Sequence, residues 1–167
     1  VIESAEGRIS LRIDASPDRA SIDIVRSDAA VKLAALPWKL SAHAAHVTVT
    51  EKHVRVANAR GSLGESSFEK AAAQVDFGKK VRLSAASGNA TLKLEQWFPW
   101  LKTRVAALEE IDSVSGGAEV ALKRLALRFD RPAEADYEAS ITPRKVSAAL
   151  KMLPAAVKAS GGSVQVN

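Results

Sequence analysis

The stretch VRLSAASGNATLKLEQWFPWLKTRV, residues 81–105, predicts most of the architecture of this chain. It begins with apolar and polar residues in alternation, from Val81 and Leu83 to Leu92 and Leu94, which is typical of a half-buried β-strand. The spacing of apolar residues then changes to that of an amphipathic helix, which we expect at about residues 95–109. The helix residues predicted to plug the sheet are Trp97, Trp100, Leu101 and Val105.

Alternation of the same kind runs through the rest of the chain, from RISLRID at residues 8–14 to the last residues. Gly61 and Gly64 are expected to break the chain, Gly116-Gly117 to end the helical pattern, and Thr142-Pro143 to separate two strands. Roughly ten short strands joined by tight turns predict a mostly β fold, an antiparallel meander. One short helix is too small to cover such a sheet, so we predict a strongly curved sheet that forms an open hydrophobic groove.

One parity of the predicted strands is almost entirely aliphatic. Because side chains of one parity share one face of a sheet, we expect them to line the groove. The predicted lining residues are Ile9, Leu11, Ile13, Ile22, Ile24, Val47, Val49, Val54, Val56, Val75, Phe77, Val81, Leu83, Leu92, Leu94, Leu122, Leu125 and Leu127.

Length and composition narrow the classes of function. The 167 residues suffice for about one domain, and the chain has no cysteine, which excludes disulfides and thiolate metal sites. The net charge is +5, but lysines and arginines are spread evenly, so we expect no nucleic-acid partner. No apolar run approaches the ~20 residues of a membrane-spanning helix. The chain begins with Val1 and no signal peptide, so we expect it to be a piece of a longer protein.

The sequence offers no catalytic or metal centre. The three histidines, His43, His46 and His53, lie close together, but no cysteine or HExxH motif accompanies them, so surface histidines near a turn are the expected account. Neither a G-x-S-x-G elbow nor a phosphate-binding glycine loop is present. We therefore predict a protein that is not an enzyme and binds no cofactor or metal.

Two segments resemble each other inside the chain. LPWKLSAHAAHVTV at residues 36–49 and LPAAVKASGGSVQV at residues 153–166 align without a gap, with an offset of 117 residues. The same offset pairs Ile24 with Ile141. Chance matching of apolar letters is one explanation. The other is a repeat, with residues 20–50 matching 137–167, which makes residues 1–167 a single β-groove section of a longer repeat protein.

A succession of motifs runs through most of residues 50–166: a strand, a Gly-x-x-Gly-x-Ser turn, a strand ending in Asp-aromatic, a Ser-Gly-x-Ala-x-Leu strand and a short aromatic-Pro helix. The residues that form these motifs are Gly61, Gly64, Ser66, Asp76, Phe77, Ser87, Gly88, Ala90, Leu92, Phe98 and Pro99. This succession resembles the pattern of the AsmA-like family of bacterial envelope proteins.

This resemblance implies a periplasmic β-groove, anchored to the inner membrane by a segment absent from these residues. It further implies that the protein carries phospholipid between the inner and outer membranes, supports envelope integrity, and meets components of both membranes through other parts of the chain. The alternative expectation is a non-catalytic structural or partner-binding β-domain with a sealed core. The two differ in whether the aliphatic face stays accessible.

Overall fold

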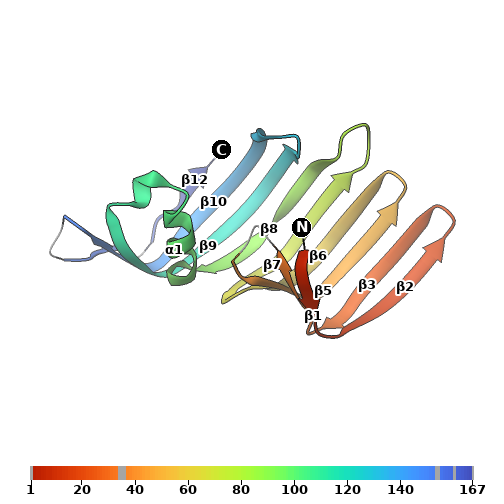
Figure 1. The fold of residues 1–167 in the computed structure, drawn as a ribbon, viewed down its shortest axis with the longest axis horizontal. Helices are drawn as coiled ribbons and strands as arrows, with labels where there is room; N and C mark the ends of the chain where they lie inside the picture. The colour runs from red at the N-terminus through yellow and green to blue at the C-terminus, as the bar shows by residue number, and fades with distance from the viewer. Residues whose placement is uncertain (1, 34–36, 153–154, 160, 167) are drawn as a thin grey trace.

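The part of the chain that the structure describes forms one antiparallel sheet of twelve strands with a single α-helix (Figure 1). The computed structural model describes residues 2–33, 37–152, 155–159 and 161–166. The strand order is β1-β4-β5-β6-β7-β8-β9-β10-β11, while β3 pairs with β5, β2 with β3, and β12 with β10. The strands are β1 (Ile2–Glu6), β2 (Ile9–Ser16), β3 (Arg19–Ser27), β4 (Ala30–Leu33), β5 (Lys39–Thr50), β6 (His53–Leu63), β7 (Ser66–Asp76), β8 (Arg82–Lys93), β9 (Ile111–Arg128), β10 (Arg131–Leu150), β11 (Val157–Ala159) and β12 (Val164–Val166).

The central part of the sheet is a meander, as predicted, with short turns between its strands except between β8 and β9, which α1 and η1 connect. Strands β5 to β10 pair in chain order, each with the next. At the β5–β6 turn the Thr50 hydroxyl oxygen accepts hydrogen bonds from the backbone N–H groups of Lys52 and His53, at 3.3 and 3.1 Å. The β6–β7 turn contains Gly64, whose φ of +61° lies in the left-handed region that favours glycine. The mostly β, antiparallel prediction is confirmed, and the sheet is not closed into a barrel.

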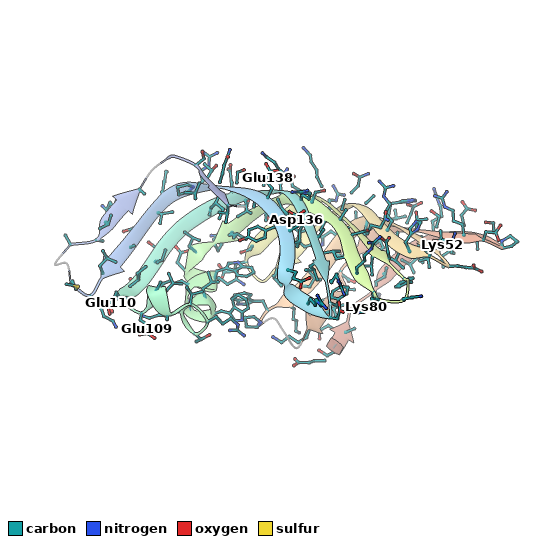
Figure 2. All side chains as sticks on the ribbon, turned by 90° about the horizontal axis from the view of Figure 1, so that it is seen from above. Lys52, Lys80, Glu109, Glu110, Asp136 and Glu138 are labelled. Carbon is teal, nitrogen blue, oxygen red and sulfur yellow. The ribbon has the colours of Figure 1, made fainter. Side chains whose placement is uncertain are left out.

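Bulges accompany the bending of the sheet. Figure 2 shows it as an arch, with the α-helix on the inner side and Glu138 on the outer side. Asn58, Lys70 and Lys145 have φ values of +52°, +52° and +51°, and each lies where the pairing with a neighbouring strand shifts. A bulge inserts an extra residue, bends its strand and increases the local twist. Several bulges in neighbouring strands therefore favour a curved sheet over a flat one.

The helix begins where it was predicted and ends earlier. Helix α1 spans Leu94–Lys102, and a 3₁₀ turn, η1, follows at Ala106–Leu108. The expectation of one helix to about residue 109 is wrong at its C-terminal end. The physical reason lies at Val105, which adopts an extended conformation with φ of −123° and ψ of 100°, a conformation suited to its β-branched side chain.

Three predicted breaks lie inside strands. Gly116-Gly117 belongs to β9, where Gly116 has a φ of +108° and would bring a Cβ to 2.4 Å from the Lys145 carbonyl oxygen. Pro143 lies within β10, opposite Ala118 of β9. On its other side β10 pairs with β12 at residues 139–141 and with β11 at residues 146–148, so Pro143 lies between the two pairings. A proline has room in a strand at such an unpaired position. Gly61, predicted to break the chain, likewise lies within β6.

Candidate functional site

Rows of aliphatic side chains cross seven strands on one face of the sheet. Directly opposed residues of paired strands share a face. Starting from β2, Ile13 lies opposite Ile22, Ile22 opposite Val47, and Val47 opposite Val56. A second row runs from Val49 through Val54, Val75 and Leu83 to Leu127. We call this the aliphatic face, and the residues that these rows and the strand alternation place on it are Leu11, Ile13, Ile22, Ile24, Val47, Val49, Val54, Val56, Val75, Leu83, Leu92, Leu122, Leu125 and Leu127.

The other predicted lining residues lie at the margins. Phe77 and Val81 flank the β7–β8 turn, outside both strands, and are 46% and 45% exposed. Leu94 is the first residue of α1. Ile9 begins β2, opposite Ser27, beyond a bulge that separates it from Leu11.

The aliphatic face remains accessible to solvent. None of the predicted lining residues is buried, and at the β2 end Ile9, Leu11 and Ile13 are 51%, 49% and 61% exposed. The buried apolar residues of the described chain are Phe98 and three alanines, Ala45, Ala59 and Ala118. Among the described residues no large side chain is fully buried.

Helix α1 covers only one end of the sheet. It packs on β9 and, to a smaller extent, on β8. Trp97 and Trp100 lie on α1 and are half-buried, as is Leu101. Val105, predicted to belong to the same helical stripe, lies beyond the end of the helix and is 41% exposed.

All three tryptophans of the chain meet in one cluster. The ring centroid of Trp38, next to the start of β5, lies 4.6 Å from that of Trp97 and 6.2 Å from that of Trp100. The rings of Trp97 and Trp100 are 5.8 Å apart and nearly perpendicular, an arrangement that aromatic pairs prefer. The cluster ties α1 to the segment that precedes β5. The sequence pattern had pointed to the helical pair but gave no partner for Trp38.

Ser66 anchors the start of α1. Its side chain is buried, with the residue 2% exposed. The hydroxyl oxygen accepts hydrogen bonds from the Trp97 indole N–H, at 2.8 Å, and from the Lys93 backbone N–H, at 3.1 Å. It lies 3.3 Å from Gln96 Oε1, to which the hydroxyl donates. Ser66, from the β6–β7 hairpin, thus contacts both the end of β8 and the first turn of α1.

Gly64 completes this anchor. The Gln96 side chain lies against it, so that a Cβ at residue 64 would come 1.8 Å from Gln96 Nε2. Gln96 Oε1 accepts a hydrogen bond from the Glu65 backbone N–H at 2.9 Å, and Nε2 donates to the Leu63 carbonyl oxygen at 3.3 Å. The Gly-x-x-Gly-x-Ser segment singled out in the sequence therefore positions the helix rather than a ligand.

The opposite face of the sheet is polar and carries ion pairs across strands. Lys123 of β9 pairs with Glu138 of β10 at 2.6 Å, and Arg124 pairs with Asp136 at 2.9 Å. Exposed pairs of this kind contribute little to stability, but they show that this face is built to meet water. The two faces of the sheet therefore have opposite chemistry.

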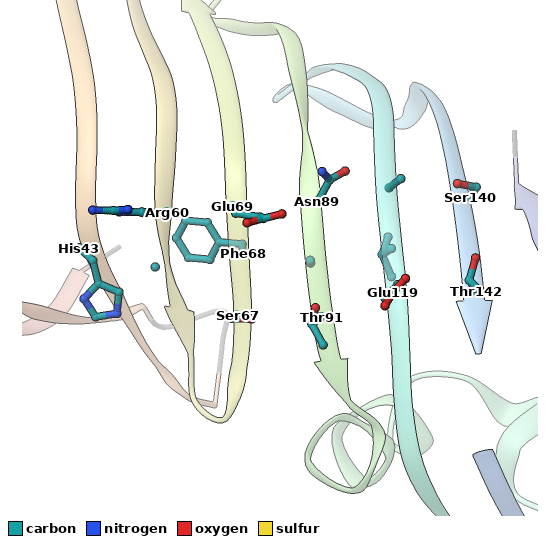
Figure 3. Close-up of a pocket in the computed structure, with 14 residues that line it drawn as sticks. His43, Arg60, Ser67, Phe68, Glu69, Asn89, Thr91, Glu119, Ser140 and Thr142 are labelled. Atoms are coloured by element: carbon teal, nitrogen blue, oxygen red, sulfur yellow. The ribbon is translucent and has the colours of Figure 1, made fainter. Parts of the chain in front are cut away.

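A cavity of about 900 Å³ on the polar face is lined by residues of β5 to β10 (Figure 3). Its polar side chains include Glu69, Asn89, Thr91 and Glu119. The pKa of Glu119 is lowered because the Arg144 guanidinium donates a hydrogen bond to its carboxylate at 2.8 Å, which favours the ionised form. A general acid needs the opposite shift, so this carboxylate is unsuited to that role. The sequence analysis did not single out this cavity, because its polar lining side chains come from six strands and form no local motif.

The histidines are dispersed among separate partners. His46 Nδ1 lies 2.5 Å from Asp23 Oδ1, and His53 Nδ1 lies 3.3 Å from the Thr50 hydroxyl. His43 lines the polar cavity. Within the described part of the chain no three His, Cys, Asp or Glu side chains are arranged to hold a metal ion.

A cluster of charges lies where the β7–β8 and β9–β10 turns meet. Asp130 accepts hydrogen bonds from Lys80, at 2.6 Å, and from Arg128, at 3.0 Å. These two cations hold the pKa of Asp130 at about 2. The cluster joins the two turns at the same end of the sheet.

Comparison with known proteins gives no relative: no family model, no curated protein and no solved structure matches this chain. In the described residues, no helix has the length and apolar character that a membrane span requires.

Proposed function

We propose that this chain is a section of a lipid-carrying β-sheet protein of the AsmA-like type. In this proposal the aliphatic face is the inner surface of a hydrophobic groove that holds phospholipid acyl chains. The section acts in the periplasm, between an inner-membrane anchor and the outer membrane, and supports envelope integrity. The observation that carries the proposal is an aliphatic face that runs across seven strands and stays accessible.

The energetics favour an apolar occupant. An aliphatic face of this extent is costly to leave in water, because apolar surface gains about 25 cal/mol for each Å² removed from water. An acyl chain gains about 0.8 kcal/mol for each buried methylene, so several methylenes give appreciable retention. Ile13 at 61% exposure and Leu11 at 49% illustrate surface that a bound chain would cover.

The polar face and the helix fit the same account. The ion pairs of β9 and β10 keep the outer side of the arch hydrated, so lipid is confined to one side. Helix α1 packs on β9 and β8 and meets β6 at its last residue, Leu63, through Gln96, so most of the face from β2 to β6 stays uncovered. Movement of lipid along such a face needs a continuous apolar path and no catalytic residue.

The alternative of a domain with a sealed core is less well supported. A sealed sheet domain of this size buries several large aliphatic side chains almost completely. In the described residues Phe98, at 8% exposure, is the only buried side chain larger than alanine among the apolar residues. The observation therefore favours an accessible face.

Lipid uptake by matched variants tests the proposal. Leu83→Asp places a charge on the aliphatic face of β8. The control, Ala85→Asp, adds the same charge to the same strand beyond a shift in its pairing, where Ala85 is exposed and lies opposite Gln74. We expect fluorescent phospholipid to bind the unchanged chain and Ala85→Asp, and to bind Leu83→Asp far less. Ile13→Asp provides a second variant at an exposed position, where the cost to folding is small. Equal uptake by all folded variants would refute the groove.

A further inference from the structure

Strand pairing near the two ends of the chain follows the same pattern. In the first segment Val31 of β4 pairs with Leu40 of β5. Adding the 117-residue offset gives Ala148 of β10 and Val157 of β11, and these two residues also pair. The neighbouring pair Ala30 and Ser41 likewise corresponds to the pair Ser147 and Lys158. Sequence similarity and hydrogen-bonded register thus agree for this part of the sheet.

The next part of the pattern is repeated with a small shift. Ile22 of β3 pairs with Val47 of β5. The equivalent residue Ala139 of β10 pairs with Val166 of β12, two positions from the equivalent of Val47. A shift of two residues keeps every side chain on its own face of a sheet. The first half of β10 therefore corresponds to β3, its second half to β4, and β11 with β12 to β5.

The two segments differ in the strand that pairs with their second edge. For β5 this is the edge away from β3 and β4, and for β11 and β12 it is the edge away from β10. Strand β5 is covered there by β6, which pairs with it from Leu40 to Val49. Strands β11 and β12 pair with β10, and no other strand among the described residues pairs with them. Val157 and Val164 are 48% and 58% exposed. An edge of this kind presents unpaired N–H and C=O groups that template a further strand.

The two segments also differ in whether the equivalent stretch forms one strand or two. With β6 in place, β5 is one strand from Lys39 to Thr50, although its pairing with β6 shifts between residues 42 and 46. The equivalent stretch of the second segment is two strands of three residues each, Val157–Ala159 and Val164–Val166. The gap between them corresponds to the place where β5 changes partner from β4 to β3.

We propose that the edge formed by β11 and β12 is a binding site for an antiparallel strand with the residue pattern of β6. The partner is defined by that pattern: Val54 and Val56 on the aliphatic face and Arg55 on the polar face. Addition of such a strand continues the aliphatic face beyond β10 and joins β11 and β12 into one strand. Main-chain hydrogen bonds supply the affinity, and alternation of side chains supplies the register.

The probe is a synthetic peptide of residues 51–64, which contains β6. We expect it to slow amide hydrogen exchange at residues 157–159 and 164–166 by about tenfold at saturation, since a paired edge amide must open before it exchanges. Two modified peptides give the control. One carries N-methyl groups at Val54 and Val56, the other at Arg55 and Ala57, and successive N–H groups of a strand point to opposite sides. One modified peptide should keep the protection and the other should lose it.

A covalent version removes the dependence on peptide affinity. Thr50 and Asn167 are equivalent in the 117-residue offset, so residues 51–77 fused after Asn167 place the β6–β7 hairpin in its equivalent position. The fused chain should show the same protection of β11 and β12. Absence of protection in both experiments, or equal protection by the two methylated peptides, would overturn the proposal. Protection that grows with protein concentration without peptide would identify a second copy as the occupant instead, and would also overturn it. Lipid uptake plays no part in either readout.

Discussion

Replacing Ser66 by alanine should release helix α1 from the sheet. Ser66 is 2% exposed, and the change removes its hydroxyl oxygen. That oxygen accepts two hydrogen bonds, from the Trp97 indole N–H and from the Lys93 backbone N–H. A donor left unpaired in a buried site costs about 1–3 kcal/mol. Trp97 is half-buried and Lys93 has an exposed side chain, so the cost of leaving each donor unpaired should lie near the lower limit of this range. The expected loss is about 2 kcal/mol in the free energy of opening this region.

Tryptophan fluorescence reports this region directly, because all three tryptophans belong to the same cluster. Urea unfolding followed by fluorescence should show the loss, and amide exchange in α1 should become about 30-fold faster, which is the equivalent of about 2 kcal/mol. Ser67→Ala is the matched control, since Ser67 is the exposed neighbour, opposite Thr91. If Ser66→Ala and Ser67→Ala both change stability by less than about 0.5 kcal/mol, the role assigned to Ser66 is wrong.

Two further predictions concern the turns. Gly64→Ala should destabilise the chain by about 1–2 kcal/mol in urea unfolding, because φ of Gly64 is +61° and the added Cβ displaces Gln96. Gly78→Ala is the control: the atom nearest to its added Cβ is 3.8 Å away, so it should change stability by less than about 0.5 kcal/mol. A similar loss in both variants would contradict the role assigned to Gly64. Asp130 has its pKa lowered from 3.8 to about 2, so its stabilising contribution is complete above pH 3.8 and is lost as pH falls towards 2. Asp130→Asn should therefore reduce the acid dependence of unfolding over that range, and an identical acid titration of both proteins would speak against the pairing with Lys80 and Arg128.

Alternation along the chain predicted the sheet because side-chain parity is a local property. Val54 and Val56 reveal their shared face from sequence spacing alone. Leu83 and Leu92 are an odd number of residues apart, and they share a face only because the pairing of β8 shifts between Leu83 and Ala86, a bulge that the spacing does not show. Parity also indicated which residues to expect on the aliphatic face.

Features that depend on neighbouring strands were missed. Pro143 lies inside a strand because the adjacent strands leave a gap beside it, which no local signal reveals. The end of α1 at Lys102 depends on the extended conformation of Val105, although the apolar spacing continued past it. The contact of Trp38 with Trp97 joins segments far apart in the chain, so only the folded structure brings it out.

Native mass spectrometry of the chain purified from bacterial cells, with extraction of bound lipid, tests the central claim most directly. The account predicts phospholipid bound to the unchanged chain and to Ala85→Asp, and its loss from folded Leu83→Asp. A folded, lipid-free chain that takes up no labelled phospholipid would contradict the account and favour a structural or partner-binding domain.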